Sequence, residues 1–146
     1  MPSTYDNLGV RFLYPDSWIL DEEDSPSATP SVTVQSPGGA FWSLAIHSPS
    51  ADPDELAQAA LEALAAEYRD SESEPVTERI GGRLIDGFDF HFFYLDFVST
   101  ALIRGFRTAT ASCLLLCQAE DREFDELAAV FRAITTSLLS SDCESE

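Results

Sequence analysis

Lysine is absent from this 146-residue chain, and all eight of its basic residues are arginine. They are outnumbered by 26 acidic residues, which gives a formal net charge of -18 at pH 7. A surface this negative repels phosphate backbones and anionic lipid headgroups, so binding to nucleic acid or to a membrane is not expected. Two explanations of the acidity stay open, because the acids are scattered along the chain: a solvated surface suited to a saline habitat, or attraction of a basic partner.

Long apolar runs are also missing. No segment reaches the ~18–20 apolar residues that span a bilayer. Residues 1–7 are short and polar, without the basic and then apolar regions of a secretory signal. The expected compartment is therefore the cytoplasm.

Cysteine is scarce, with three residues in the chain. Cys113 and Cys117 lie four positions apart in an apolar segment expected to form a strand, which separates their Cα atoms by ~13 Å. A disulfide needs a separation below ~7 Å, and a zinc site would need further Cys or His residues nearby. We expect two buried free thiols, with Cys143 as a third thiol in a polar tail.

Catalytic signatures are lacking too. The G-x-S-x-G nucleophile motif is absent, and Gly38-Gly39 and Gly81-Gly82 lack the following residues of a phosphate loop. The acidic run at 21–24 lacks the spacing of a calcium-binding loop. No catalytic, cofactor-binding or metal-binding residue is therefore predicted, and the protein is not expected to be an enzyme.

The two histidines, His47 and His91, carry the one enzyme hypothesis. It requires them to lie within a few ångströms of each other, or of a carboxylate such as Asp89 or Asp96, inside a cleft. The favoured interpretation is that both are sheet residues at the solvent boundary.

The chain does have the composition of a globular domain, with 45% hydrophobic residues and ten phenylalanines. Alternating apolar residues and turn signals predict strands at 9–15, 31–36, 40–47, 75–80, 83–97, 98–108 and 111–119. Asp52, Pro53 and Glu55 form a helix start, so helices are expected from there to Tyr68 and over 120–139. Loops are expected at 21–30 and 70–75. Residues 1–139 form a single domain in this prediction, and 140–146 a polar flexible tail.

The longest predicted strand, 83–97, is apolar on both faces. Phe88, Phe90, Phe92 and Tyr94 alternate with Ile85, Phe93, Leu95 and Phe97. Both faces are then expected to be covered, and Gly87 is a natural bulge position. The sequence therefore predicts an α+β fold: a three-layer αβα sandwich with a mostly antiparallel six- or seven-stranded sheet and two main helices.

The order of these elements, with a few local signatures, resembles the PsbP/Mog-like superfamily. The signatures are Gly9-Val10-Arg11-Phe12 with Tyr14-Pro15-Asp16-Ser17-Trp18, the turn Ile80-Gly81-Gly82, and the closing helix from Phe131 to Leu139. The superfamily includes the PsbP proteins of photosystem II, Mog-type Ran-GTPase-binding proteins, and bacterial DcrB- and Eag-type relatives. The resemblance implies a fold for residues 5–139, and a non-catalytic binding subunit, assembly factor or chaperone.

The leading functional hypothesis is thus a cytoplasmic adaptor, assembly factor or chaperone-like module that binds another protein. The expected partner is basic or presents an apolar helix, and a homodimer stays open. Trp42, Arg104, Phe106 and Arg107 are the candidate partner-binding residues, since Arg and aromatic residues are enriched at interface hot spots. The favoured alternative is that the arginines form internal salt bridges and the tryptophan lies in the core. A second hypothesis is a carrier of a small apolar ligand, marked by a closed apolar pocket of ~300 Å³ or more between the sheet and a helix.

Overall fold

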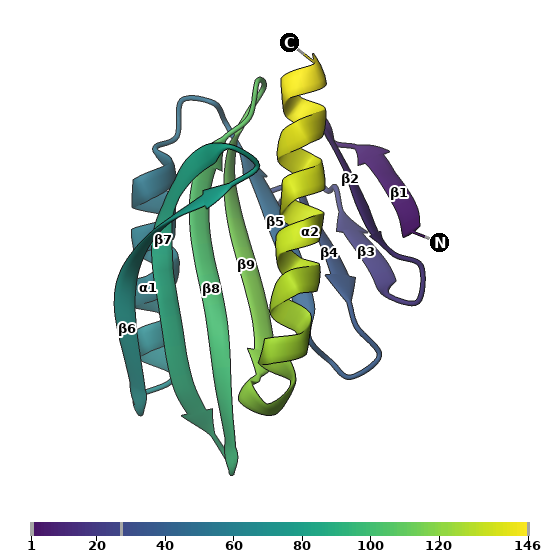
Figure 1. The fold of residues 1–146 in the computed structure, drawn as a ribbon. Coiled ribbons are helices and arrows are strands. Elements are labelled where there is room, and N and C mark those ends of the chain that lie inside the picture. Colours follow the sequence, from purple (N-terminus) through teal and green to yellow (C-terminus); the bar gives the residue numbers. More distant parts are fainter. Residues whose placement is uncertain (1, 27, 146) are drawn as a thin grey trace.

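The computed structural model describes residues 2–26 and 28–145, with the exception of the side chains of residues 94 and 142–145. In chain order the elements are β1 (Pro2–Asn7), β2 (Val10–Pro15), β3 (Ile19–Glu23), β4 (Ser31–Gln35), β5 (Phe41–His47), α1 (Pro53–Glu67), β6 (Ser71–Ile80), β7 (Arg83–Tyr94), β8 (Phe97–Arg107), β9 (Ser112–Glu120) and α2 (Asp121–Ser145). Figure 1 shows how they are arranged.

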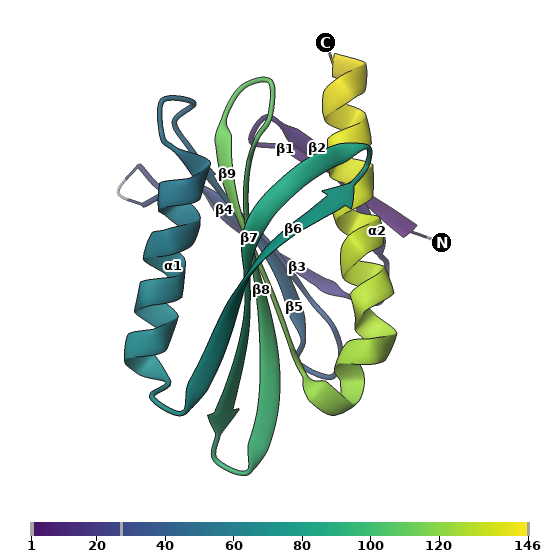
Figure 2. The same cartoon turned by 60° about the vertical axis from the view of Figure 1, so that its left-hand side comes forward.

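The strands form two sheets. Seven strands pair in the order β3-β4-β5-β9-β8-β7-β6, and β1 and β2 form a separate hairpin beside α2. Every pairing between neighbours is antiparallel. Figure 2 shows α1 and α2 on opposite sides of the large sheet. The predicted α+β sandwich is therefore confirmed.

Both helices begin as their sequences predict. The Asp52 carboxylate accepts a hydrogen bond of 2.9 Å from the backbone N–H of Asp54, and Pro53 occupies the first helical position. The second helix starts with Asp121 and Glu123 in its first turn, where the helix dipole favours acids. It continues to Ser145, whereas the sequence predicted its end at Leu139. Neither Gly nor Pro follows Leu139, so nothing in the tail breaks the helix there.

The structure adds strands where loops were expected. Ser71–Pro75 belongs to β6, and residues 21–23 belong to β3. Both are edge strands of the large sheet and are mostly exposed, so their polar and acidic composition resembles that of a loop. Pro75 is tolerated because an edge strand has one side without a pairing partner.

Gly87 forms no bulge, so this prediction is wrong. It pairs in register with Val76 on one side and with Arg104 on the other. A Cβ atom at this position would collide with the carbonyl oxygen of Ile103. Glycine therefore allows close strand approach here, rather than an extra residue.

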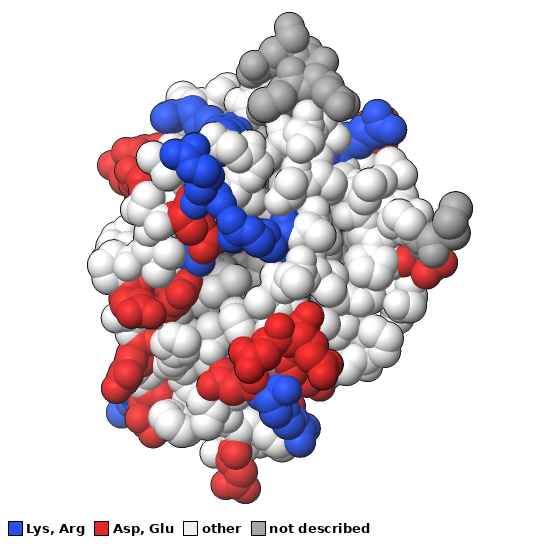
Figure 3. Space-filling view, viewed as in Figure 1, with Lys and Arg blue, Asp and Glu red and all other residues white. Residues whose placement is uncertain are grey.

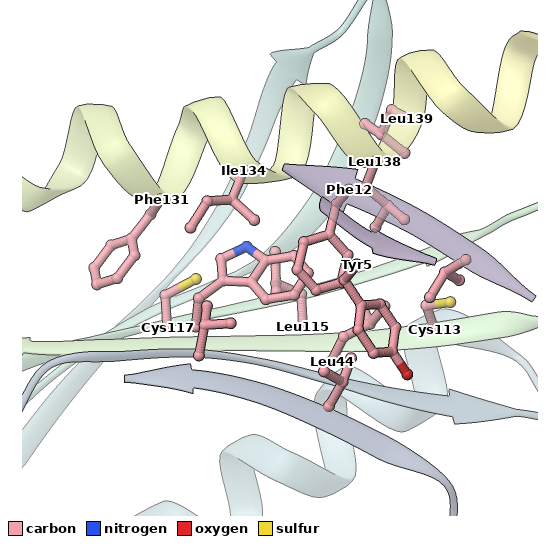
Figure 4. Close-up of a cluster of buried hydrophobic side chains, with 14 of the residues drawn as sticks. Tyr5, Phe12, Leu44, Cys113, Leu115, Cys117, Phe131, Ile134, Leu138 and Leu139 are labelled. Carbon is pink, nitrogen blue, oxygen red and sulfur yellow. The ribbon is translucent and has the colours of Figure 1, made fainter. Parts of the chain in front are cut away.

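The core has a large part between the sheet, α2 and the β1–β2 hairpin, and a smaller part beneath α1. In Figure 4 four side chains of α2 point toward the sheet: Phe131, Ile134, Leu138 and Leu139. On the opposite face, Ala57 of α1 belongs to one cluster with Phe90, Phe92, Ala101 and Ile103, and Ala60, Leu61 and Leu64 of the same helix pack against it. Each large apolar side chain buried in this way contributes about 1.5–3 kcal/mol to folding.

Cys113 and Cys117 are buried thiols that form no disulfide, as predicted. Burial raises the pKa of the Cys117 thiol, so the neutral form persists at physiological pH. The prediction for Cys143 concerns a side chain outside those that the structure describes.

Candidate functional site

The four candidate partner-binding residues do not form a surface. Trp42, Arg104 and Phe106 have 0, 3 and 4% of their surface exposed. Another protein cannot contact side chains buried to this extent, which corrects the prediction for these three. Arg107 is exposed, and its Nη2 donates a hydrogen bond of 3.2 Å to the carbonyl oxygen of Ala51.

Arg104 instead sits in an internal ion-pair cluster, as the favoured alternative predicted. Its Nη2 lies 2.9 Å from Asp89 Oδ1 and 3.1 Å from Glu78 Oε2. Its Nη1 donates hydrogen bonds of 3.0 Å to the carbonyl oxygens of Phe88 and Ile103. Its Nε–H, which is also buried, has no hydrogen-bond partner in the described part of the chain.

Beside this cluster, a cavity of about 300 Å³ opens between the sheet and α2. Its polar lining residues are Glu78, Asp89, Arg104, Arg132 and Thr135. The remaining lining is formed by Ile80, Leu102, Leu115, Cys117, Phe124, Ala128, Ala129 and Phe131. We call this space the Arg104 cavity. Trp42 lies next to it, since its indole N–H donates a 2.9 Å hydrogen bond to Thr135 Oγ1.

The two histidines lie far apart. Because paired residues point to the same face of a sheet and faces alternate along a strand, His47 is on the α1 side and His91 on the α2 side. His47 pairs with Ser112 of β9, whereas His91 pairs with Thr100, whose partner on β9 is Ala119. Seven strand residues place these two levels ~23 Å apart. The version of the enzyme hypothesis in which His47 and His91 act together is therefore wrong.

His91 takes part in a chain of hydrogen bonds that is structural. The Thr100 hydroxyl donates to Asp121 Oδ1 over 2.7 Å, and His91 Nδ1 lies 2.9 Å from the same hydroxyl oxygen. Since the threonine proton is directed at Asp121, His91 Nδ1 is the donor and does not act as a base toward Thr100. The chain joins β7, β8 and the first residue of α2.

An exposed apolar surface lies at the turn between β7 and β8. Phe93, Leu95, Phe97 and Val98 have 53, 79, 45 and 37% of their surface exposed. We call these four residues the β7–β8 tip. In Figures 1 and 2 this turn extends beyond the ends of both helices, so neither helix covers it. The prediction that both faces of the long strand are covered fails for this end of it.

The backbone at the tip is locally unfavourable. Leu95 is the first of the two turn residues between the strands and has φ 57°, a left-handed conformation. Glycine is preferred at such a position, because a left-handed L-residue costs about 1–2 kcal/mol. Sequence analysis missed this surface because its aromatic residues continue the alternation of a buried strand. Asp96, a turn-forming residue inside that pattern, was the available signal.

Acidic groups lie around the tip. Asp96 is in the turn itself, and the carbonyl oxygen of Asp70 accepts a 3.1 Å hydrogen bond from the N–H of Phe93. The Arg122 guanidinium lies 5.7 Å from the centre of the Phe97 ring and is held by Glu120 over 3.0 Å. Figure 3 shows acidic side chains predominating at the end of the molecule where this turn lies.

The described residues lack two further kinds of feature. No group of three or more His, Cys, Asp or Glu side chains among them could hold a metal ion. Within the same ranges, no helix combines the length and the apolar composition needed to cross a membrane.

The fold places this chain among PsbP-like α+β sandwiches. Cyanobacterial PsbP from Synechocystis sp. PCC 6803 is similar over 93% of this chain and 90% of its own, with a TM-score of 0.62 and 14% identity. The Pseudomonas aeruginosa protein PA94, of unknown function, matches over 94% and 95%, with a TM-score of 0.51 and 11% identity. LpqN of Mycobacterium tuberculosis, involved in cell envelope biogenesis, matches over 92% and 86%, with a TM-score of 0.48 and 17% identity.

At these identities the likeness concerns the fold, and it confirms the predicted PsbP-like architecture. No family model matches the sequence. No curated protein matches it either.

Proposed function

We propose that this protein is a non-catalytic binding module that holds a basic, amphipathic segment of another protein at the β7–β8 tip. The observation that carries the proposal is Leu95, which is 79% exposed in a left-handed conformation. Glycine or asparagine at this position would adopt the left-handed backbone at a lower cost and would expose no apolar side chain. An outlier of this kind at an exposed apolar surface is expected where the side chain serves binding.

The chemistry of the partner follows from the surroundings of the tip. The apolar side chains of Phe93, Phe97 and Val98 would accept an apolar face, since burying them removes aromatic surface from water. The acids at the tip and the net charge of -18 would attract and orient basic residues beside that face. A second copy of this chain carries the same net charge, so electrostatic repulsion opposes its binding at the tip.

The PsbP-like fold supports the proposal in a general way. The resemblance to PsbP-like proteins implies a non-catalytic binding subunit, and a module of this kind needs no catalytic groups. A compartment is part of the proposal as well: we place the module in the cytoplasm.

The test compares two exposed leucines on the same strand pair. Leu95→Asn removes the apolar side chain and suits the left-handed backbone, so it should raise the melting temperature while abolishing partner binding. Leu84→Asn, at a residue that is 65% exposed near the other end of β7, is the control and should retain binding. A photo-crosslinking residue at position 93 or 84 in the tagged chain, expressed in its own cells, reports the contact.

The proposal requires one basic protein that crosslinks from position 93 and not from position 84, and that is lost with Leu95→Asn. Equal capture by Leu95→Asn, or no crosslinked product at all, would overturn it. Self-association of the purified chain that Leu95→Asn abolishes would assign the tip to a second copy, and would also overturn it.

A further inference from the structure

We propose that the Arg104 cavity binds a small neutral molecule that is mainly apolar and carries a hydroxyl group. This site is separate from the β7–β8 tip, because no tip residue lines the cavity. The inference therefore does not rest on the proposed protein partner.

The size of the cavity limits the ligand. An apolar cavity of about 150 Å³ holds benzene. The Arg104 cavity, at about 300 Å³, is at the lower limit of small-molecule sites and suits a molecule with two fused rings. Phe124, Phe131, Leu102 and Leu115 supply an apolar surface for such rings.

The charges in the cavity favour a neutral ligand. Two arginines, Arg104 and Arg132, lie against two carboxylates, Glu78 and Asp89, so the formal charges of the cluster sum to zero. The terminal nitrogens of Arg104 are already engaged by these carboxylates and by two carbonyl oxygens. A charged ligand would lose its hydration without gaining an unpaired counter-charge, which is costly in a partly buried site.

The hydrogen-bonding capacity that remains favours a hydroxyl group. Arg104 Nε–H is buried too deeply for a ligand atom to reach, so the carboxylates of the cluster are the polar groups that a ligand can contact. The side chains of Asp89 and Glu78 are 24% and 30% exposed. Each carboxylate oxygen can accept more than one hydrogen bond, so both groups can still accept a hydrogen bond from a ligand. A hydroxyl group can donate to either carboxylate without adding a charge to the site.

The ion-pair cluster is weak evidence for a purely stabilising role. Replacing a buried ion pair by apolar residues of similar volume is often neutral or stabilising, so such a cluster is weak support for stability alone. A few polar groups that converge on an otherwise apolar cavity are the usual composition of a small-molecule site. Arg104, Asp89 and Glu78 are the polar groups that converge on the apolar lining of this cavity.

The probe for the test is naphthalen-2-ylmethanol, titrated into the ¹⁵N-labelled full chain. Saturable binding should shift the NMR cross-peaks of the Trp42 indole N–H, which is bonded to the lining residue Thr135, and of Arg104 Nε–H. The charged analogues 2-naphthoate and naphthalen-2-ylmethylammonium should bind at least about tenfold more weakly. Unmoved cross-peaks, or equal binding of a charged analogue, would overturn the proposal.

A pair of variants on α2 locates the binding. Ala128→Phe places a ring in the cavity, and it should raise the dissociation constant of the probe at least about tenfold. Ala133→Phe adds the same ring to the same helix at a groove beside Leu13 and Tyr14, and should leave that constant within about twofold. Equal affinity of the two variants would place the probe elsewhere. Leu95→Asn should bind the probe like the wild type, which separates this test from that of the tip.

Discussion

Tyr5, Asn7 and Glu22 connect the β1–β2 hairpin to the edge strand β3. The Glu22 carboxylate accepts hydrogen bonds of 2.6 Å from the Tyr5 hydroxyl and 3.0 Å from Asn7 Nδ2. Both bonds lower the pKa of Glu22, and the bond from Tyr5 has the larger effect. Burial and the bond to Glu22 raise the pKa of Tyr5. The charged form of Glu22 is thus preferred in the folded state.

Replacing Glu22 tests this coupling through pH. A lowered pKa contributes stability above the unfolded value of about 4.3, and the contribution disappears as the pH falls through the folded value. Glu22→Gln should therefore lower the urea midpoint at pH 7, and its difference from the wild type should shrink below about pH 4. Glu23→Gln, on the same strand, is the control. A difference that stays constant between pH 7 and pH 3 would contradict the assignment.

At the level of elements, the close approach of β7 and β8 depends on Gly87. An alanine Cβ there would collide with the carbonyl oxygen of Ile103. The two strands could move apart only by weakening the backbone hydrogen bonds between them. Gly87→Ala should destabilise the protein by about 3 kcal/mol, measured by urea unfolding.

Gly39→Ala is the matched control for this prediction. A Cβ at Gly39 meets nothing within 4 Å, but φ is 96°, so only backbone strain of about 1 kcal/mol is expected. If Gly39→Ala lowers the free energy of unfolding more than Gly87→Ala does, the steric explanation of Gly87 is wrong.

The elements also differ in how well sequence alone predicted them. The helices α1 and α2 and the inner strands β5, β8 and β9 carry strong apolar periodicity and were placed within a few residues at their starts. The hairpin strand β1 and the edge strand β3 were missed, and β6 was assigned only in part. These strands bury little surface, so they lack the apolar alternation of an inner strand, and pairing with the next strand of the chain rather than composition determines them.

For the whole molecule, charge dominates the response to solvent. Repulsion among 26 carboxylates, opposed by eight arginines, disfavours the compact state, and salt screens it. The melting temperature should rise between about 0.1 M and 1 M NaCl, where the Debye length falls from about 10 to 3 Å. Sucrose at equal osmolality is the control, because it strengthens burial without screening. A melting temperature that is flat or falls with NaCl would contradict this prediction.

Apolar periodicity, turn residues and helix caps by themselves determined the antiparallel sandwich, its two helices and the absence of a disulfide at Cys113 and Cys117. These are local properties, since each depends on the spacing of residues near one another in the chain. Only the tertiary structure decided that Arg104 is buried against Asp89 and Glu78, and that Leu95 is exposed. Burial depends on which distant segments cover a residue. The end of the β7–β8 hairpin extends past both helices, and no pattern within the hairpin encodes their lengths.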